Sequence, residues 1–287
     1  MKPKRKKQLT TFLKIAISFS LIALVFSELD WKEIGDLLKI ANPFYFAGAV
    51  ILFLISQVIS VFRFNIFIRK IGVRLSFEAN SKLYLLGMFY NFFLPGGVGG
   101  DAYKAFALSK SHQKSLKKVG QIVFVERFLG IVAIGFMFCV LILFVQTPYA
   151  IYWNFGISIL GMISTLVVLK LIIRFLHTYK KRIYIGFFYS ILIQLSQLIS
   201  VYFLLKSFQI EGGYLIYLLL FLVSSVLSVI SFAGLGIREA VFYYGAQWFQ
   251  FNGDISAAVA LSFSLITAAV SFMGILYLFQ KIPLKKK

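Results

Sequence analysis

The chain has 287 residues, of which 60% are hydrophobic and only 14% are charged, and its mean hydropathy is +0.87. Soluble globular chains contain about 45–50% apolar and about 25% charged residues, so this composition excludes a soluble domain and predicts a polytopic membrane protein. The net charge of +20 lies in short basic clusters between apolar segments, which argues against a nucleic-acid partner.

The first apolar run covers residues 11–27 and follows a basic tail. A secretory signal peptide has the same order of charge and hydrophobicity, but no small-x-small cleavage site follows, and the run ends at Ser27-Glu28. We therefore expect a retained first span. The next run, 44–66, is long enough to return across about 30 Å of hydrocarbon.

The basic clusters predict which side of the membrane each loop occupies. They lie in the N-terminal tail and at 67–74, 110–118, 174–182 and 281–287, whereas 28–43 is net acidic and 146–150 is uncharged. Lys and Arg accumulate on the cytoplasmic side of membrane proteins. The pattern predicts a multi-pass protein of the cytoplasmic membrane with both termini inside and its basic loops against the anionic inner leaflet.

The apolar stretch 83–108 contains "NFFLPGGVGGDAYKAF", residues 91–106, and has basic loops at both ends. Proline and clustered glycine break a helix, and a single crossing would place one of the two loops outside. We therefore predict a re-entrant hairpin that enters from the cytoplasm and breaks at PGGVGG. Lys104 is expected near its cytoplasmic mouth, and Asp101 is well placed to be the N-cap of its second helix.

Three further spans are predicted at 119–145, 151–173 and 184–206. The stretch 213–250, with "SFAGLGIREAVFYYG" in its middle, must begin and end outside for 256–280 to cross back to the basic C-terminus. The predicted fold is an all-α polytopic membrane protein with six full spans and two re-entrant helical hairpins. It forms one transmembrane domain, residues 1–287.

The two halves of the chain repeat each other. Gly97-Val98-Gly99-Gly100-Asp101-Ala102 is similar to Gly234-Leu235-Gly236-Ile237-Arg238-Glu239-Ala240, and the predicted spans recur at displacements of 140, 140 and 137 residues (11 to 151, 44 to 184, 119 to 256). An odd number of crossings in each half makes the halves antiparallel. Inverted repeats built around discontinuous helices are typical of transporters, so 11–145 and 151–280 are predicted as the two repeats.

The hairpin breaks are the candidate site, because a helix that restarts at membrane depth presents free N–H groups and the positive end of its dipole to an anion. Neither a P-loop nor a Rossmann fingerprint is present. The alternative is that the glycines permit tight packing and the charges pair for stability. The candidate binding residues are Gly96, Gly97, Gly99, Gly100, Asp101, Lys104, Arg63, Glu126, Arg127, Gly234, Gly236, Arg238 and Glu239.

Three of these charges lie in full spans. Arg63 is near the inner end of its span and has the alternative of extending to the headgroups. Glu126 and Arg127 are adjacent and point about 100° apart on a helix, so one or both should turn toward the first hairpin. No catalytic set, metal cluster or cofactor motif is predicted, and the single cysteine, Cys139, forms no intramolecular disulfide.

The motifs "FLPGGVGGDAYKAF", "VFVERFLG" and "GLGIREAVF" resemble the signatures of the flippase-like, lysylphosphatidylglycerol synthase transmembrane-domain family across essentially the whole chain. The resemblance implies a lipid flippase fold and a site at the motif positions. Two departures are present. Ser231-Phe232-Ala233 stands where the family often has proline. The sequence ends at Lys287, so we expect no soluble aminoacyl-transferase domain, and the cargo need not be lysylphosphatidylglycerol.

The leading hypothesis is a lipid translocator that is not an enzyme and moves an anionic phospholipid or a lipid-phosphate-linked headgroup. An ion-coupled transporter of a small soluble anion is the second hypothesis, and a membrane-embedded lipid-phosphate enzyme is the third. The predicted partners are an anionic membrane lipid and the bilayer, with no nucleic acid, and a homo-oligomer stays open.

Overall fold

A computed structural model describes residues 36, 39–93, 99–145, 151–228, 236–280 and 282–284. The chain divides into two compact units, Met1–Ala41 and Asn42–Lys287, and the helices below belong to the second. The predicted first span, 11–27, lies outside the described residues. So do Pro95, Gly96, Gly97 and Gly234 of the predicted breaks.

The described residues form helices and no strands, which confirms the all-α prediction for this part of the chain. Five helices are long and apolar enough to cross a membrane, and they lie where sequence predicts spans two to six. They are α3 (Pro43–Ile68), α6 (Leu116–Ile142), α7 (Ile151–Phe175), α8 (Lys180–Ser207) and α11 (Gly253–Phe272), the last continued by the 3₁₀ helix η5 (Met273–Tyr277).

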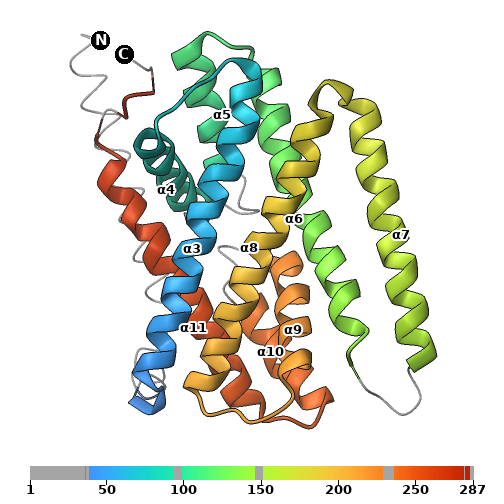
Figure 1. Cartoon of the computed structure of the whole chain (residues 1–287). Helices are drawn as coiled ribbons and strands as arrows, with labels where there is room; N and C mark the ends of the chain where they lie inside the picture. Colours follow the sequence, from blue (N-terminus) through green and yellow to red (C-terminus); the bar gives the residue numbers. More distant parts are fainter. Residues whose placement is uncertain are drawn as a thin grey trace. The chain divides into compact units, whose positions relative to one another are not determined.

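Four shorter helices form two packed pairs. These are α4 (Phe77–Phe93) with α5 (Gly99–His112), and α9 (Tyr214–Leu227) with α10 (Ile237–Trp248). The longest, α4, has 17 residues and spans about 25 Å, less than the hydrocarbon thickness. Within this unit α4 and α5 lie toward one end of the long helices and α9 and α10 toward the other (Figure 1).

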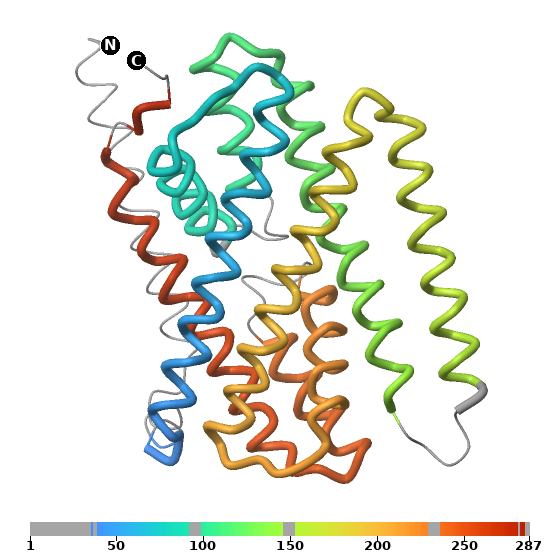
Figure 2. Tube along the Cα trace, viewed as in Figure 1, coloured from blue at the N-terminus to red at the C-terminus, as the bar shows by residue number. Residues whose placement is uncertain are grey.

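The most extensive helix–helix contact in the described part of the chain is between α3 and α8, which are antiparallel (Figure 2). The Ser200 hydroxyl donates to the Ala49 carbonyl at 2.8 Å near one end, and Arg182 Nη1 donates to the Ile66 carbonyl at 2.6 Å near the other. Residue numbers therefore rise along α3 as they fall along α8. This seam forms one wall of the region in which the site lies.

Close backbone contact fixes α5 against α4. A Cβ on Gly100 would lie 1.7 Å from the Gly87 carbonyl oxygen, so only glycine permits this approach. The apolar core at this end contains fully buried side chains from α3, α4, α5 and α6, among them Phe67, Leu83, Leu108 and Leu129. The packing places the N-terminal part of α5 beside Phe64 of α3 and Arg127 of α6.

Candidate functional site

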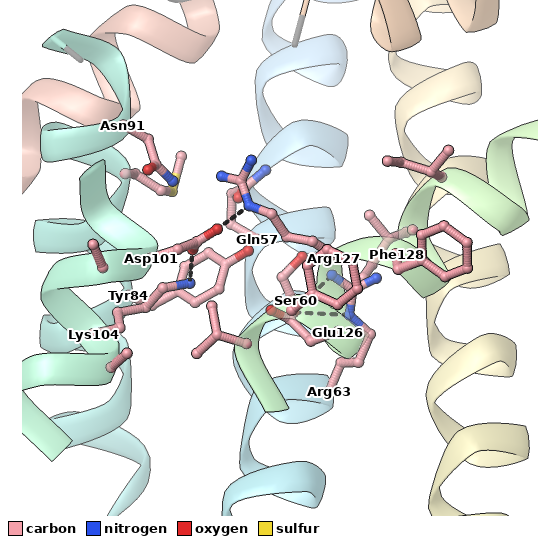
Figure 3. A pocket seen from close by; sticks show the side chains of 18 of the residues that line it. Gln57, Ser60, Arg63, Tyr84, Asn91, Asp101, Lys104, Glu126, Arg127 and Phe128 are labelled. Atoms are coloured by element: carbon pink, nitrogen blue, oxygen red, sulfur yellow. Dashed lines mark hydrogen bonds and ion pairs between the residues drawn. The ribbon is translucent and has the colours of Figure 1, made fainter. Parts of the chain in front are cut away.

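A cavity of about 600 Å³ lies between α3, α4, α5, α6 and α8 (Figure 3). Among the described residues that line it, the charged side chains are Arg63, Asp101, Lys104, Glu126 and Arg127. All five are residues that sequence predicts for the site. They come from positions up to 64 residues apart in the chain (63 to 127), so the helix packing has assembled them.

Arg63 of α3 and Glu126 of α6 form a buried ion pair. Arg63 Nε and Nη2 donate to Glu126 Oε1 at 3.0 and 2.7 Å, and Nη1 donates to the Ser190 hydroxyl of α8 at 2.7 Å. The two residues are 7% and 2% exposed. Arg63 therefore directs its guanidinium toward Glu126 and does not extend to the headgroups, and the pair joins three helices at the cavity wall.

Asp101 of α5 holds two cations. Lys104 Nζ lies 2.8 Å from Asp101 Oδ1, and Arg127 Nε of α6 pairs with Oδ2. Lys104 is 4% exposed, and its ammonium also lies over the rings of Phe64 and Tyr84, 5.0 and 4.8 Å from their centroids. The Arg127 side chain is 36% exposed. Arg127 is thus the most accessible cation of the five-residue set, and it turns toward the first predicted hairpin.

The start of α5 differs from the sequence prediction, which made Asp101 the N-cap. The helix begins at Gly99, so Asp101 lies inside its first turn with its carboxylate on Lys104 and Arg127. The cap is supplied by Asn91 of α4, whose Oδ1 accepts from the Gly100 N–H at 2.7 Å. A negative charge in the first turn is still favourable, because it faces the positive end of the helix dipole.

Uncharged polar residues complete the cavity, and sequence reasoning missed them. Gln57 and Ser60 come from α3 and Gln197 from α8. The Nε2 atoms of Gln57 and Gln197 both approach the Ser56 hydroxyl, at 3.0 and 3.4 Å. The spacing of Gln57, Ser60 and Arg63 puts them on one helix face, and this spacing was the sequence pattern that could have identified them. A glutamine or serine in an apolar run, however, indicates a site far less strongly than a charge does.

The second-half motif forms a separate cluster that does not line this cavity. Arg238 Nη1 donates to the Ser264 hydroxyl at 3.3 Å, and that hydroxyl donates to Glu239 Oε1 at 2.7 Å. Arg238 is 7% exposed, with its guanidinium carbon 4.9 Å from the centroid of the Phe263 ring. Glu239 Oε2 also accepts from the Gly236 N–H at 2.6 Å. Gly236 has φ +81°, a conformation that favours glycine.

The described part of the chain contains no group of three or more His, Cys, Asp or Glu side chains that would hold a metal ion. The arrangement is instead suited to binding an anion. Guanidinium and ammonium groups supply charge-assisted donors for phosphate or carboxylate, and they lie beside a helix N-terminus.

A family model described as the lysylphosphatidylglycerol synthase TM region matches residues 11–278. The match includes both motif clusters and all of the described helices up to η5. No curated protein matches the chain.

Proposed function

The chain belongs to the lysylphosphatidylglycerol synthase transmembrane-region family, as its three motifs predict, and from this premise we propose that it translocates an anionic lipid across the cytoplasmic membrane. The headgroup, a phospholipid phosphate or a lipid-phosphate-linked group, would enter the charged cavity while its tails stay in the bilayer. The proposal is transport without chemical change of the lipid.

The observation that carries this proposal is the buried charged cavity. Ionisable side chains inside membrane-length helices are costly and usually functional. Here Arg63, Lys104 and Arg127 outnumber Asp101 and Glu126, so the described lining has an excess of positive charge. Such an excess is stable when an anion completes the site.

The wall of the cavity favours a lipid over a small soluble anion. Phe124 and Ile131 of α6 line the cavity, and they are 69% and 41% exposed. An apolar wall that continues from the cavity to the lipid-facing surface is what a lipid needs, because its tails must stay in hydrocarbon. A transporter of a soluble anion, the second hypothesis, would seal its site from lipid.

We also propose that the two halves form an inverted repeat. The starts of four consecutive helices recur at displacements of 137, 137, 138 and 137 residues (Pro43 to Lys180, Phe77 to Tyr214, Gly99 to Ile237, Leu116 to Gly253). The leading helices of the two sets, α3 and α8, are antiparallel (Figure 2). Both observations support repeats over 11–145 and 151–280, with α4–α5 and α9–α10 as re-entrant hairpins from opposite faces.

The repeat relates the two charged clusters. At these displacements Asp101 corresponds to Glu239 and Arg127 to Ser264. Asp101 pairs with Arg127 in the first half, and Glu239 accepts from Ser264 in the second. The second cluster is therefore the counterpart of the first, with a hydroxyl in place of a guanidinium. We propose that the headgroup is held at the first cluster and leaves past the second, where Arg238 is the cation.

Orientation follows from the basic loops. Those between α3 and α4, α5 and α6, and α7 and α8 lie at the α4–α5 end of the unit (Figure 1), so we place that end in the cytoplasm. With Cys139 replaced, single cysteines at Lys82 and Ser111 should be protected from an impermeant thiol reagent outside intact cells. Cysteines at Glu211 and Asn252 should react. Ends of one hairpin that label from opposite sides would refute the re-entrant arrangement.

The function itself is tested by reconstitution. Purified protein in vesicles, with a panel of fluorescent anionic lipids, should increase the fraction of label that reaches the other leaflet, measured by quenching with dithionite. Arg127→Gln should reduce this rate about tenfold or more, since it removes the most accessible cation. Arg174→Gln, an exposed arginine on α7, is the matched control. Uptake of a soluble anion with no lipid movement would favour the second hypothesis.

A further inference from the structure

We infer that the cavity selects headgroups with one net negative charge, that is phosphodiester monoanions, and that Asp101 sets this preference as a built-in counter-ion. This inference rests on the proposed function and specifies its substrate class. It concerns binding, so it can fail while lipid translocation stands.

The first argument is the charge balance. Three cations and two carboxylates line the described cavity, which leaves a net charge of +1. Charges withdrawn from water must be compensated, because an unpaired one is strongly unfavourable in a low-dielectric site. A monoanion completes the balance, a dianion leaves the site at −1, and a zwitterion leaves it at +1.

The second argument is which cation can accept the headgroup. Arg63 is occupied at Nε, Nη1 and Nη2 by Glu126 and Ser190. Lys104 is enclosed by Asp101 and two aromatic rings. Arg127 is also paired, through Nε with Asp101, but its side chain is 36% exposed, far more than those of Arg63 and Lys104, and its planar fork suits a phosphate oxygen pair. The phosphate therefore meets Arg127.

Asp101 then acts as the internal counter-ion. One carboxylate oxygen of Asp101 pairs with Lys104 and the other pairs with Arg127. The single negative charge of Asp101 therefore neutralises only one of these two cations. When a phosphate takes Arg127, Asp101 remains paired with Lys104, and only one positive charge is left for the ligand. Removal of the Asp101 charge would raise the cavity to +2 and favour a dianion.

The test measures displacement of a fluorescent phosphatidylglycerol from the purified full chain in maltoside micelles. The competitors are phosphatidylglycerol, phosphatidic acid, phosphatidylcholine and lysylphosphatidylglycerol. A phosphomonoester has its second pKa at about 6, so phosphatidic acid is a dianion at pH 8 and a monoanion at pH 5. In the wild type we expect phosphatidylglycerol to bind about tenfold or more tightly than phosphatidic acid at pH 8. The gap should close at pH 5.

The variants test the role of Asp101. Asp101→Asn should reverse the preference at pH 8 toward phosphatidic acid. Asp101→Asn combined with Lys104→Met removes both partners of a buried pair, returns the cavity to +1, and should restore the wild-type preference. Asp254→Asn, the same change at an exposed aspartate of α11, should have no effect. Should Asp101→Asn not fold, the double variant and the pH series still decide.

Three outcomes overturn the inference. These are equal binding of the two anionic lipids by the wild type at pH 8, a double variant that prefers the dianion, and tighter binding of lysylphosphatidylglycerol than of any anionic lipid. The last would assign the carboxylates to a cationic headgroup. A wild type that binds none of the anionic probes would instead refute the proposed function.

Discussion

Glu126→Gln should lower the stability of the folded protein strongly, although it hardly changes the shape of the side chain. Glutamine has almost the volume of glutamate but no charge, so it leaves the buried Arg63 guanidinium without the carboxylate that neutralises it. Both members of the pair are almost fully buried. Removing one member of such a pair costs about 3–5 kcal/mol, because the other charge is left uncompensated.

The free energy is read from thermal unfolding of the purified protein, followed by tryptophan fluorescence in one detergent. We expect Glu126→Gln to lower the melting temperature by several degrees or more. Combining it with Arg63→Met should recover most of the loss, because the stranded cation is then removed as well. Glu211→Gln, at an exposed glutamate, should leave the melting temperature unchanged. A Glu126→Gln protein as stable as this control would show that Arg63 is not buried as described.

Three further changes test the neighbouring features. Gly100→Ala should destabilise the protein by about 3 kcal/mol or more, since its methyl group would overlap the backbone of α4. The control Gly135→Ala, whose methyl group meets nothing within 4 Å, should be neutral or stabilising by about 0.5–1 kcal/mol. Equal melting temperatures of the two variants would contradict the close approach of α5 to α4. Asn91→Ala should cost about 1 kcal/mol in the same melt, because the Gly100 N–H loses its acceptor, and an unchanged melting temperature would argue against the cap. Arg238→Lys should melt normally and translocate labelled lipid poorly, since lysine lacks the planar fork; full transport would remove Arg238 from the site.

The sequence by itself was sufficient to predict where the five membrane-length helices lie in the chain. Long apolar runs predict α3, α6, α7 and α8, and α11 together with η5, to within about four residues at each end, because the length of hydrocarbon that a span must cross limits where it begins and ends. It was also sufficient to mark the charged residues of the cavity. A charge in an apolar segment is costly enough to be noticed without knowing its partner, and this is how Arg63, Asp101, Lys104, Glu126 and Arg127 were found.

Sequence alone did not determine the partners. Glu126 faces Arg63, whereas its neighbour Arg127 faces Asp101, and which of the two turns to which helix depends on how α6 is rotated. Asn91 caps α5 because the glycine contact brings α4 and α5 together.

Tertiary structure also separated Arg238 from the cavity, although its motif matches that of Asp101. Contacts between helices depend on rotation, crossing angle and distance, and these are determined by the packing of the whole bundle rather than by any one segment.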